Sequence, residues 1–348
     1  MNRFRCLLIA MTLIFVTPFG VHADGSIGET SVENFCEIKN TTTTSDTDML
    51  VPDKLKKGDK VGIIAPANPA TDDSLSRATD ILENAGFVPV ISDDIKCGWI
   101  GDPTGEKRAA AFNKLVSDST IKAIICLRGG YGSMHIIDKI DYAMFRKNRP
   151  ILVGYSDITA LHMAIYKNAH VITFHGPMLS SNYGQKESFE CLFNMLMDNL
   201  NNFELSNIDN SDFKTLKKGI AQGELVGGNM VLISALMGTD YEINTEGKIL
   251  FIEELEEPLY RLDRILHQLK LAGKFDKVAG IIIGDIYKCD SGDGSALQGV
   301  LNFFKENVDV PVIYNVHAGH NTNPITLPLG AQVRIEDNCC SLIQKVVK

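Results

Sequence analysis

Ser156 lies where a short apolar run changes into a helical pattern, within GYSDIT at 154–159. Some hydrolases expose a nucleophilic serine at such a strand-to-helix turn, and a base and oxyanion donors then activate it. The backbone N–H of Asp157 would be one donor, at the positive end of the following helix. The second glycine of the G-x-S-x-G elbow is missing, because Ile158 occupies its position. Taken alone, the stretch is explained more simply as a helix capped by Ser156 or Asp157.

A glycine-rich loop, RGGYG at 128–132, follows another apolar run. Glycines after a strand let the backbone approach a ligand closely, so the N–H of Gly130 is a candidate second oxyanion donor. A tight turn explains the same spacing equally well. A nucleotide site is disfavoured, because the loop has neither a G-x-G-x-x-G pattern nor a G-K-[ST] ending.

Two acids and two histidines in the C-terminal half could complete such a site. Glu253 and Glu254 end an apolar run, where a rigidly held carboxylate could orient a histidine. His317 and His320 follow later, and histidine is the expected base for a serine nucleophile. Surface acids and a structural histidine are the commoner explanation of each feature alone. The histidine spacing does not match H-E-x-x-H, so a zinc site is not expected.

Short β-rich runs alternate with helical patterns from residue 60 to residue 180. Such alternation predicts a parallel sheet that is covered by helices on both faces. Ligands bind such sheets at the carboxyl ends of the strands, and three loops are expected there: 65–70, 128–133 and 154–159. The candidate nucleophile and the glycine-rich loop would therefore lie at one edge of the sheet.

The length of 348 residues and the ordinary globular composition, 45% hydrophobic and 22% charged, suggest two domains. We predict an N-terminal α/β domain at 51–184, a polar linker at 185–217 and a mixed domain with several strands at 218–348. The formal charge of -9 disfavours a nucleic-acid partner, because such proteins are normally basic.

The first 23 residues predict a secretory signal peptide, since Arg3 and Arg5 precede an apolar run that ends at the small residue Ala23. Residues 24–50 are polar and rich in Thr and Ser, which predicts a flexible lead-in. We therefore expect a periplasmic or secreted protein with no stable membrane insertion after cleavage. An uncleaved anchor is the alternative.

Several sequence blocks, taken together and in order, resemble the LD-carboxypeptidase family of serine peptidases, also called murein tetrapeptide carboxypeptidases. The resemblance extends over residues 55–345, nearly all of the chain after the leader. The blocks are VGIIAPANP, LRGGYGSMHIID, ILVGYSDITALH, VITFHGPM, GELVGGNMVLISALMGT, ILFIEELEEPLYRLDRILHQLKLAG and HAGHNTNPITLPLG.

The family uses a Ser-Glu-His triad in that chain order. The resemblance therefore implies Ser156 as the nucleophile, Glu253 as the residue that orients the histidine, and His320 as the general base. It implies the backbone N–H groups of Asp157 and Gly130 as oxyanion donors. It also implies a Rossmann-like or flavodoxin-like N-terminal domain, a C-terminal domain with a β-barrel, an active site between them, and homodimers.

The implied reaction releases the terminal D-alanine of a murein tetrapeptide through an acyl-enzyme, without a metal or cofactor. A carboxypeptidase must recognise a free carboxylate, for which Arg128 is a candidate; a structural ion pair is the alternative. Glu254 departs from the family, whose members often carry Asp at that position. Family members often act in the cytoplasm on recycled wall fragments, which is the alternative location.

Two other functions remain open. One is a microcin-immunity-type peptidase of the same family, which cleaves an amide between a peptide or amino acid and a modified nucleotide. The other is a secreted protein that captures muropeptides without cleaving them. The stretch EEPLYRLDRILHQL at 256–269 is more similar to the murein enzymes. The complete set of Ser156, Glu253 and His320 argues against simple capture.

Overall fold

The computed structural model describes residues 48–180, 186–198 and 204–348, which belong to one compact unit, Ser45–Lys348. The predicted signal peptide and nearly all of the predicted lead-in lie outside the described residues. Within those three ranges, no helix is long and apolar enough to cross a membrane.

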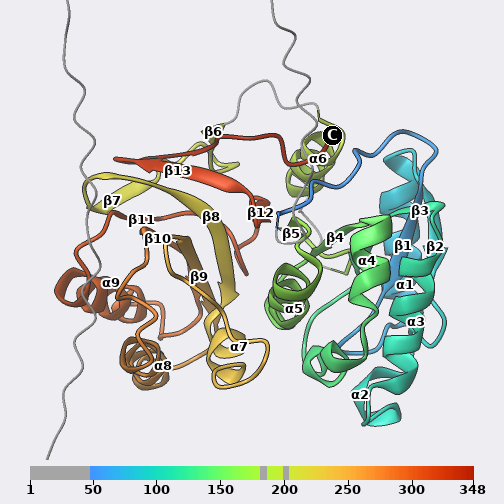
Figure 1. The fold of residues 1–348 in the computed structure, drawn as a ribbon, viewed down its shortest axis with the longest axis horizontal. Coiled ribbons are helices and arrows are strands. Elements are labelled where there is room, and N and C mark those ends of the chain that lie inside the picture. The colour runs from blue at the N-terminus through green and yellow to red at the C-terminus, as the bar shows by residue number, and fades with distance from the viewer. Residues whose placement is uncertain (1–47, 181–185, 199–203) are drawn as a thin grey trace, which may run out of the picture. The chain divides into compact units, whose positions relative to one another are not determined.

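The first sheet is mainly parallel (Figure 1). Its strands run in the order β2-β1-β3-β4-β5, which is the flavodoxin-like doubly wound order. A late strand, β12, pairs antiparallel with β5 at the edge of this sheet. The strands are β1 Lys60–Ile64, β2 Val88–Ile91, β3 Ile121–Cys126, β4 Ile151–Gly154, β5 Thr173–His175 and β12 Leu327–Leu329.

Helices cover both faces of the first sheet, as the alternating pattern predicted. Ile124 and Leu152 pack in one core cluster with α3, α4 and α5, whereas Ile125 and Val153 pack in another with α1 and α6. Burial on both faces explains the nearly continuous apolar runs of the strands. The helices are α1 Asp72–Asn84, α2 Gly98–Gly101, α3 Glu106–Ser117, α4 Tyr142–Asn148, α5 Thr159–Ala169 and α6 Lys186–Leu196, with 3₁₀ turns η1 Ser133–His135, η2 Ile137–Lys139 and η3 Ser156–Ile158.

The second sheet has the order β6-β14-β13-β8-β9-β10-β11-β7 and curls into a half-barrel (Figure 1). Strands β8, β9, β10 and β11 are parallel, and the outer strands pair antiparallel. The predicted fold class is therefore confirmed. The strands are β6 Glu204–Leu205, β7 Lys214–Lys217, β8 Ile220–Asn229, β9 Ile249–Leu255, β10 Gly280–Tyr287, β11 Val312–Tyr314, β13 Gln332–Glu336 and β14 Cys339–Leu342.

Three helices pack on one face of the second sheet, where Leu250, Ile252 and Ile283 join their core. The other face buries Phe251, Ile282 and side chains from β13 and β14. The segment 185–217, which was predicted as a linker, contains α6, β6 and β7 in its described part. The helices of this half are α7 Met230–Ala235, α8 Leu259–Leu271 and α9 Ser295–Asn307.

Close backbone packing joins β8 to β9. Gly227 has a φ of +131°, and a Cβ at this position would overlap the carbonyl oxygen of Phe251. Two residues later, Asn229 pairs with Glu253 across the two strands. Glycine at position 227 therefore sets the spacing that brings the end of β8 beside Glu253.

Replacing Gly227 with Ala should destabilise the protein by about 3 kcal/mol or more, because the new methyl group would meet fixed backbone. Gly247→Ala is the matched control: Gly247 also has a positive φ, of +69°, but has open space around its Cβ position. The control should cost only about 1–2 kcal/mol. Chemical denaturation measures both values, and equal losses would contradict the packing argument.

Candidate active site

Ser156 has a backbone conformation that residues other than glycine rarely adopt. Its φ is +64°, directly after the extended residue Tyr155 and before the helical turn that leads into α5. Such a conformation costs on the order of 1–3 kcal/mol and is concentrated at functional sites. The side chain is partly exposed although its neighbours are buried. This geometry favours an exposed nucleophile over a simple helix cap.

The turn is built without the second glycine of the hydrolase elbow. Ile158 is fully buried, and its Cγ2 would lie 2.8 Å from a Cβ at Gly154. The first glycine of the motif is therefore required because Ile158 packs over it. The turn remains sharp although Ile158 replaces the second glycine of the G-x-S-x-G motif.

The loops that follow β1 and β3 pack against this turn. A Cβ on Gly129 would lie 3.1 Å from Ser156 Cβ and 3.5 Å from the backbone nitrogen of Asp157. Gly130 has a φ of +112°, and a Cβ there would overlap the side chain of Asn68. Asn68 N–H in turn donates to the carbonyl of Gly129 at 3.3 Å. The loops lie at one edge of the sheet, as their places after the strands predict, but no sequence pattern marks Asn68.

Glu253 and His320 form a short buried pair. The distance between His320 Nδ1 and Glu253 Oε2 is 2.7 Å, and the Glu253 side chain is completely buried. Gly319 has a φ of +128°, and its Cβ position lies 2.7 Å from the same carboxylate oxygen. Only glycine lets the loop approach this closely. A proton on Nδ1 that bonds to the carboxylate leaves Nε2 as the basic nitrogen.

A ring contact joins the nucleophile turn to this pair. The centroids of Tyr155 and His320 are 4.8 Å apart in an edge-to-face arrangement. The imidazole therefore packs on the residue that precedes Ser156. The structure contains no hydrogen bond between Ser156 Oγ and His320, and such catalytic bonds often tighten only when substrate binds.

A second connection runs from the start of α5 to the carboxyl end of β9. Asn229 N–H donates to Thr159 Oγ1 at 3.0 Å, and Asn229 Nδ2 donates to Glu254 Oε1 at 2.8 Å. Gly228 lies against the Thr159 side chain. Thr159 and Asn229 lie within recognised sequence blocks, yet no local pattern predicts that they meet.

Three acids act on the imidazole through their charges. Burial, and then the charge of Glu253, raises the pKa of Glu254 to about 7 against the effect of three N–H donors. Burial likewise raises the pKa of Asp285 to about 7. Burial alone would lower the pKa of His320, but the charges of Glu253, Glu254 and Asp285 outweigh it and raise this pKa.

The other sequence candidates have different surroundings. Arg128 is partly buried and makes no ion pair or hydrogen bond with any residue that the structure describes. His317 lies 3.4 Å from Asp209, measured from Nδ1 to Oδ2. His175 is fully buried between the rings of Tyr155 and Phe251, and burial holds its pKa well below the ordinary value.

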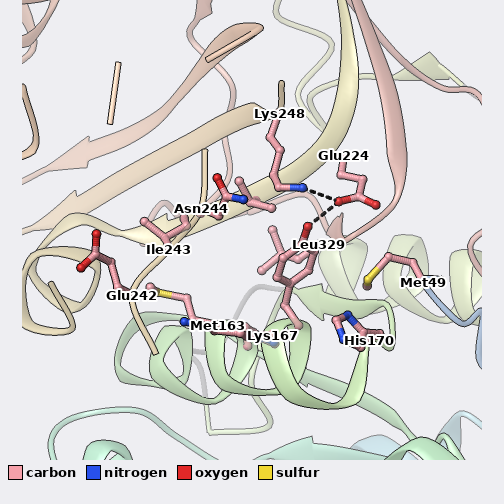
Figure 2. Close-up of a pocket in the computed structure, with 14 residues that line it drawn as sticks. Met49, Met163, Lys167, His170, Glu224, Glu242, Ile243, Asn244, Lys248 and Leu329 are labelled. Atoms are coloured by element: carbon pink, nitrogen blue, oxygen red, sulfur yellow. Dashed lines mark hydrogen bonds and ion pairs between the residues drawn. The ribbon is translucent and has the colours of Figure 1, made fainter. Parts of the chain in front are cut away.

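A cavity of about 490 Å³ lies elsewhere, along α5 near the amino end of β9 (Figure 2). Its charged groups largely satisfy one another: Lys248 and Tyr166 both donate to Glu224, and Glu242 pairs with Lys274. Glu253 is near the opposite end of β9, so this cavity is separate from the pair of Glu253 and His320. In the three described ranges, no three ligand-type side chains are placed to hold a metal ion.

Comparisons with known proteins identify the family to which the chain is similar. Models of the LD-carboxypeptidase N-terminal and C-terminal domains match residues 61–176 and 222–335. The chain is 37% identical over 294 residues to a "Probable murein peptide carboxypeptidase" of Bacillus subtilis, covering 81% of this chain and 90% of that protein. It is 28% identical over 318 residues to the "Microcin C7 self-immunity protein MccF" of Escherichia coli, covering 81% and 92%.

Solved structures show the same fold. An MccF-like protein from Bacillus anthracis superposes with a TM-score of 0.74 at 27% identity, covering 85% of this chain and 99% of that one. A muramoyltetrapeptide carboxypeptidase from Oxalobacter formigenes gives a TM-score of 0.68 at 24% identity, covering 81% and 97%. Because both domain models match and the Bacillus subtilis relative aligns over most of the chain, the protein belongs to the LD-carboxypeptidase family of serine peptidases.

Proposed function

We propose that this protein is a serine carboxypeptidase that releases the terminal D-alanine of murein tetrapeptides by hydrolysing an L,D-peptide bond. The observation that carries the proposal is the buried pair of Glu253 and His320, which packs against the turn that presents Ser156. A base, a carboxylate that orients it and an exposed serine nucleophile are the parts of a serine-histidine-acid triad for acyl transfer.

In the proposed mechanism, His320 Nε2 removes the proton of Ser156 Oγ as the oxygen attacks the carbonyl carbon of the scissile bond. Glu253 stabilises the resulting imidazolium. The N–H groups of Asp157 and Gly130 stabilise the oxyanion. The imidazolium then protonates the leaving D-alanine nitrogen, the C–N bond breaks, and an acyl-enzyme remains. A water molecule, deprotonated by His320, hydrolyses this ester and restores Ser156.

Arg128 is the proposed site for the terminal carboxylate of the substrate. Its guanidinium is partly buried and lacks a carboxylate partner in the described part of the chain, while the next residue, Gly129, lies against Ser156. A planar guanidinium binds a carboxylate through two parallel hydrogen bonds. Arg128 would thus limit cleavage to the last residue of the peptide.

The higher identity to the murein relative than to the microcin relative, 37% against 28%, supports a murein peptide as substrate. The microcin-immunity-type reaction and simple muropeptide capture are the alternatives that the assays below separate.

We also propose that the mature enzyme is periplasmic or secreted and forms a homodimer.

Replacing Ser156 with Ala should reduce D-alanine release from tetrapeptide by ~10³-fold or more, because no nucleophile remains. The assay compares tri-, tetra- and pentapeptide muropeptides with an aminoacyl-nucleotide amide, using chromatography to follow the products. Wild-type cleavage confined to the amide would favour the microcin-immunity reaction. An unchanged melting curve is the folding control, and wild-type-like release by S156A would refute the nucleophile assignment.

The acidic limb of the kcat/KM profile should have its midpoint above pH 6.5, the ordinary pKa of histidine, because the pKa of His320 is raised. A general base must be neutral, so activity present at higher pH is lost as pH falls through this pKa. Replacing Glu253 with Gln should shift the limb to lower pH. A wild-type midpoint below 6.5 would contradict the described electrostatics.

Arg128→Gln should raise KM for tetrapeptide by ~10–100-fold, since a charge-assisted hydrogen bond contributes about 1.5–3 kcal/mol. Arg128→Lys should recover part of the loss because it keeps the charge but not the planar fork. Arg334→Gln is the control, because Arg334 pairs with Glu336 on β13, away from the nucleophile turn. An unchanged KM in R128Q would rule out the carboxylate role.

A further inference from the structure

Asp285 lies at an irregular position of β10, next to the buried pair. The register of β10 against β9 shifts between Ile283 and Ile286, so Asp285 falls inside the irregularity. Bulges of this kind redirect side chains and are frequent beside active sites. At the preceding residue, a Cβ on Gly284 would lie 2.6 Å from the carbonyl oxygen of Ala318. The glycine therefore lets the strand lie directly against the histidine loop, the segment 315–326 between β11 and β12.

Asp285 bonds to the histidine loop on both sides of His320. Its own N–H donates to the carbonyl of Ala318 at 3.1 Å. Its carboxylate oxygen Oδ2 accepts from the N–H of Asn321 at 3.0 Å. Asp285 is thus hydrogen-bonded to the backbone of Ala318, two positions before His320, and of Asn321, one position after it.

We propose that Asp285 is a positioning residue that holds His320 in the orientation needed to bond Glu253 and to receive the proton of the nucleophile. The inference deepens the proposed function, and it rests on that function for its kinetic readout. Asp285 has no ion-pair partner among the described residues, and its charge is one of those that raise the pKa of His320.

The groups that contact His320 or act on it through charge come from four elements. Glu253 and Glu254 lie on β9, Asp285 on β10, His175 on β5, and Tyr155 in the turn after β4. Burial, followed by the charge of Glu253, raises the pKa of Asp285, and the Asn321 N–H and His320 oppose this rise. An ionised Asp285 helps to hold the imidazolium. Removing its charge should therefore lower the pKa of His320.

Two substitutions separate the two contributions. In Asp285→Asn the amide oxygen can still accept from Asn321 N–H, but the charge is lost. In Asp285→Ala both are lost. Asp337→Asn, in the exposed turn between β13 and β14, is the matched control and should behave as wild type.

We expect kcat of D285A to fall ~10–100-fold with KM changed by less than about threefold, because a misplaced base affects the transition state more than binding. D285N should recover most of kcat, and its acidic limb should lie lower than that of the wild type by at least ~0.3 pH units. If D285A does not fold, the acidic limb of the kcat/KM profile of D285N tests whether Asp285 acts on His320.

Two outcomes would overturn the proposal: a wild-type kcat in folded D285A, or a rise in KM alone, which would make Asp285 a substrate contact. An NMR titration of His320 in wild type and D285N gives a readout that needs no substrate. A lowered imidazole pKa in D285N would show that the carboxylate of Asp285 acts on His320 even if the tetrapeptide proved to be the wrong substrate. If the proposed function itself is wrong, the wild-type protein will show no hydrolysis that depends on Ser156.

Discussion

A fully buried carboxylate with a single side-chain partner is the constraint on which the rest of this structure depends. Glu253 has no exposed surface, its Oε2 bonds to His320, and its Oε1 has no hydrogen-bond partner in the part of the chain that is described. Burying a charge costs several kcal/mol unless a partner compensates. The fold must therefore keep the imidazole at this oxygen. Gly319 lets the loop approach the carboxylate, and the hydrogen bonds of Asp285 to Ala318 and Asn321 hold the loop there.

The histidine loop is anchored in both sheets. Before it, β11 pairs with β10 in the half-barrel; after it, β12 pairs with β5 in the parallel sheet. Figure 1 shows β12 beside β5, between the two groups of strands. His320 therefore belongs to a segment that joins the two sheets. This arrangement explains how His320, from the end of the chain, comes to pack on the turn that follows β4, and why a change in either sheet would alter the proposed site.

Local sequence signals predicted much of the first sheet and located its functional edge. The alternation of apolar runs and helical patterns was sufficient for the parallel sheet, because each strand and helix has its own periodicity. The glycines of the loop at 128–132 and the turn at 154–159 indicated where the strands end. The roles of Ser156, Glu253 and His320 came from the family resemblance, since an isolated serine, acid or histidine usually has a structural explanation.

Other features depend on contacts between distant residues, which periodicity does not encode. The antiparallel pairing of β12 with β5 joins segments about 150 residues apart, and a run of three residues carries too little pattern to predict it. Asn229 and Asp285 are short polar residues at strand ends, where turns and caps are the usual interpretation. Their importance appears only when the strands are aligned, so that one meets Thr159 and Glu254 and the other meets the histidine loop.

The most direct test of this account is the rate at which a fluorophosphonate modifies Ser156, followed by peptide mapping with mass spectrometry in wild type and in Glu253→Gln. The reagent needs an activated serine but no particular peptide. The account predicts labelling at Ser156 in the wild type and labelling slower by ~10²-fold or more in folded E253Q, because the imidazole loses its orienting charge. Modification of a different serine, or equal rates at Ser156 in both proteins, would contradict it.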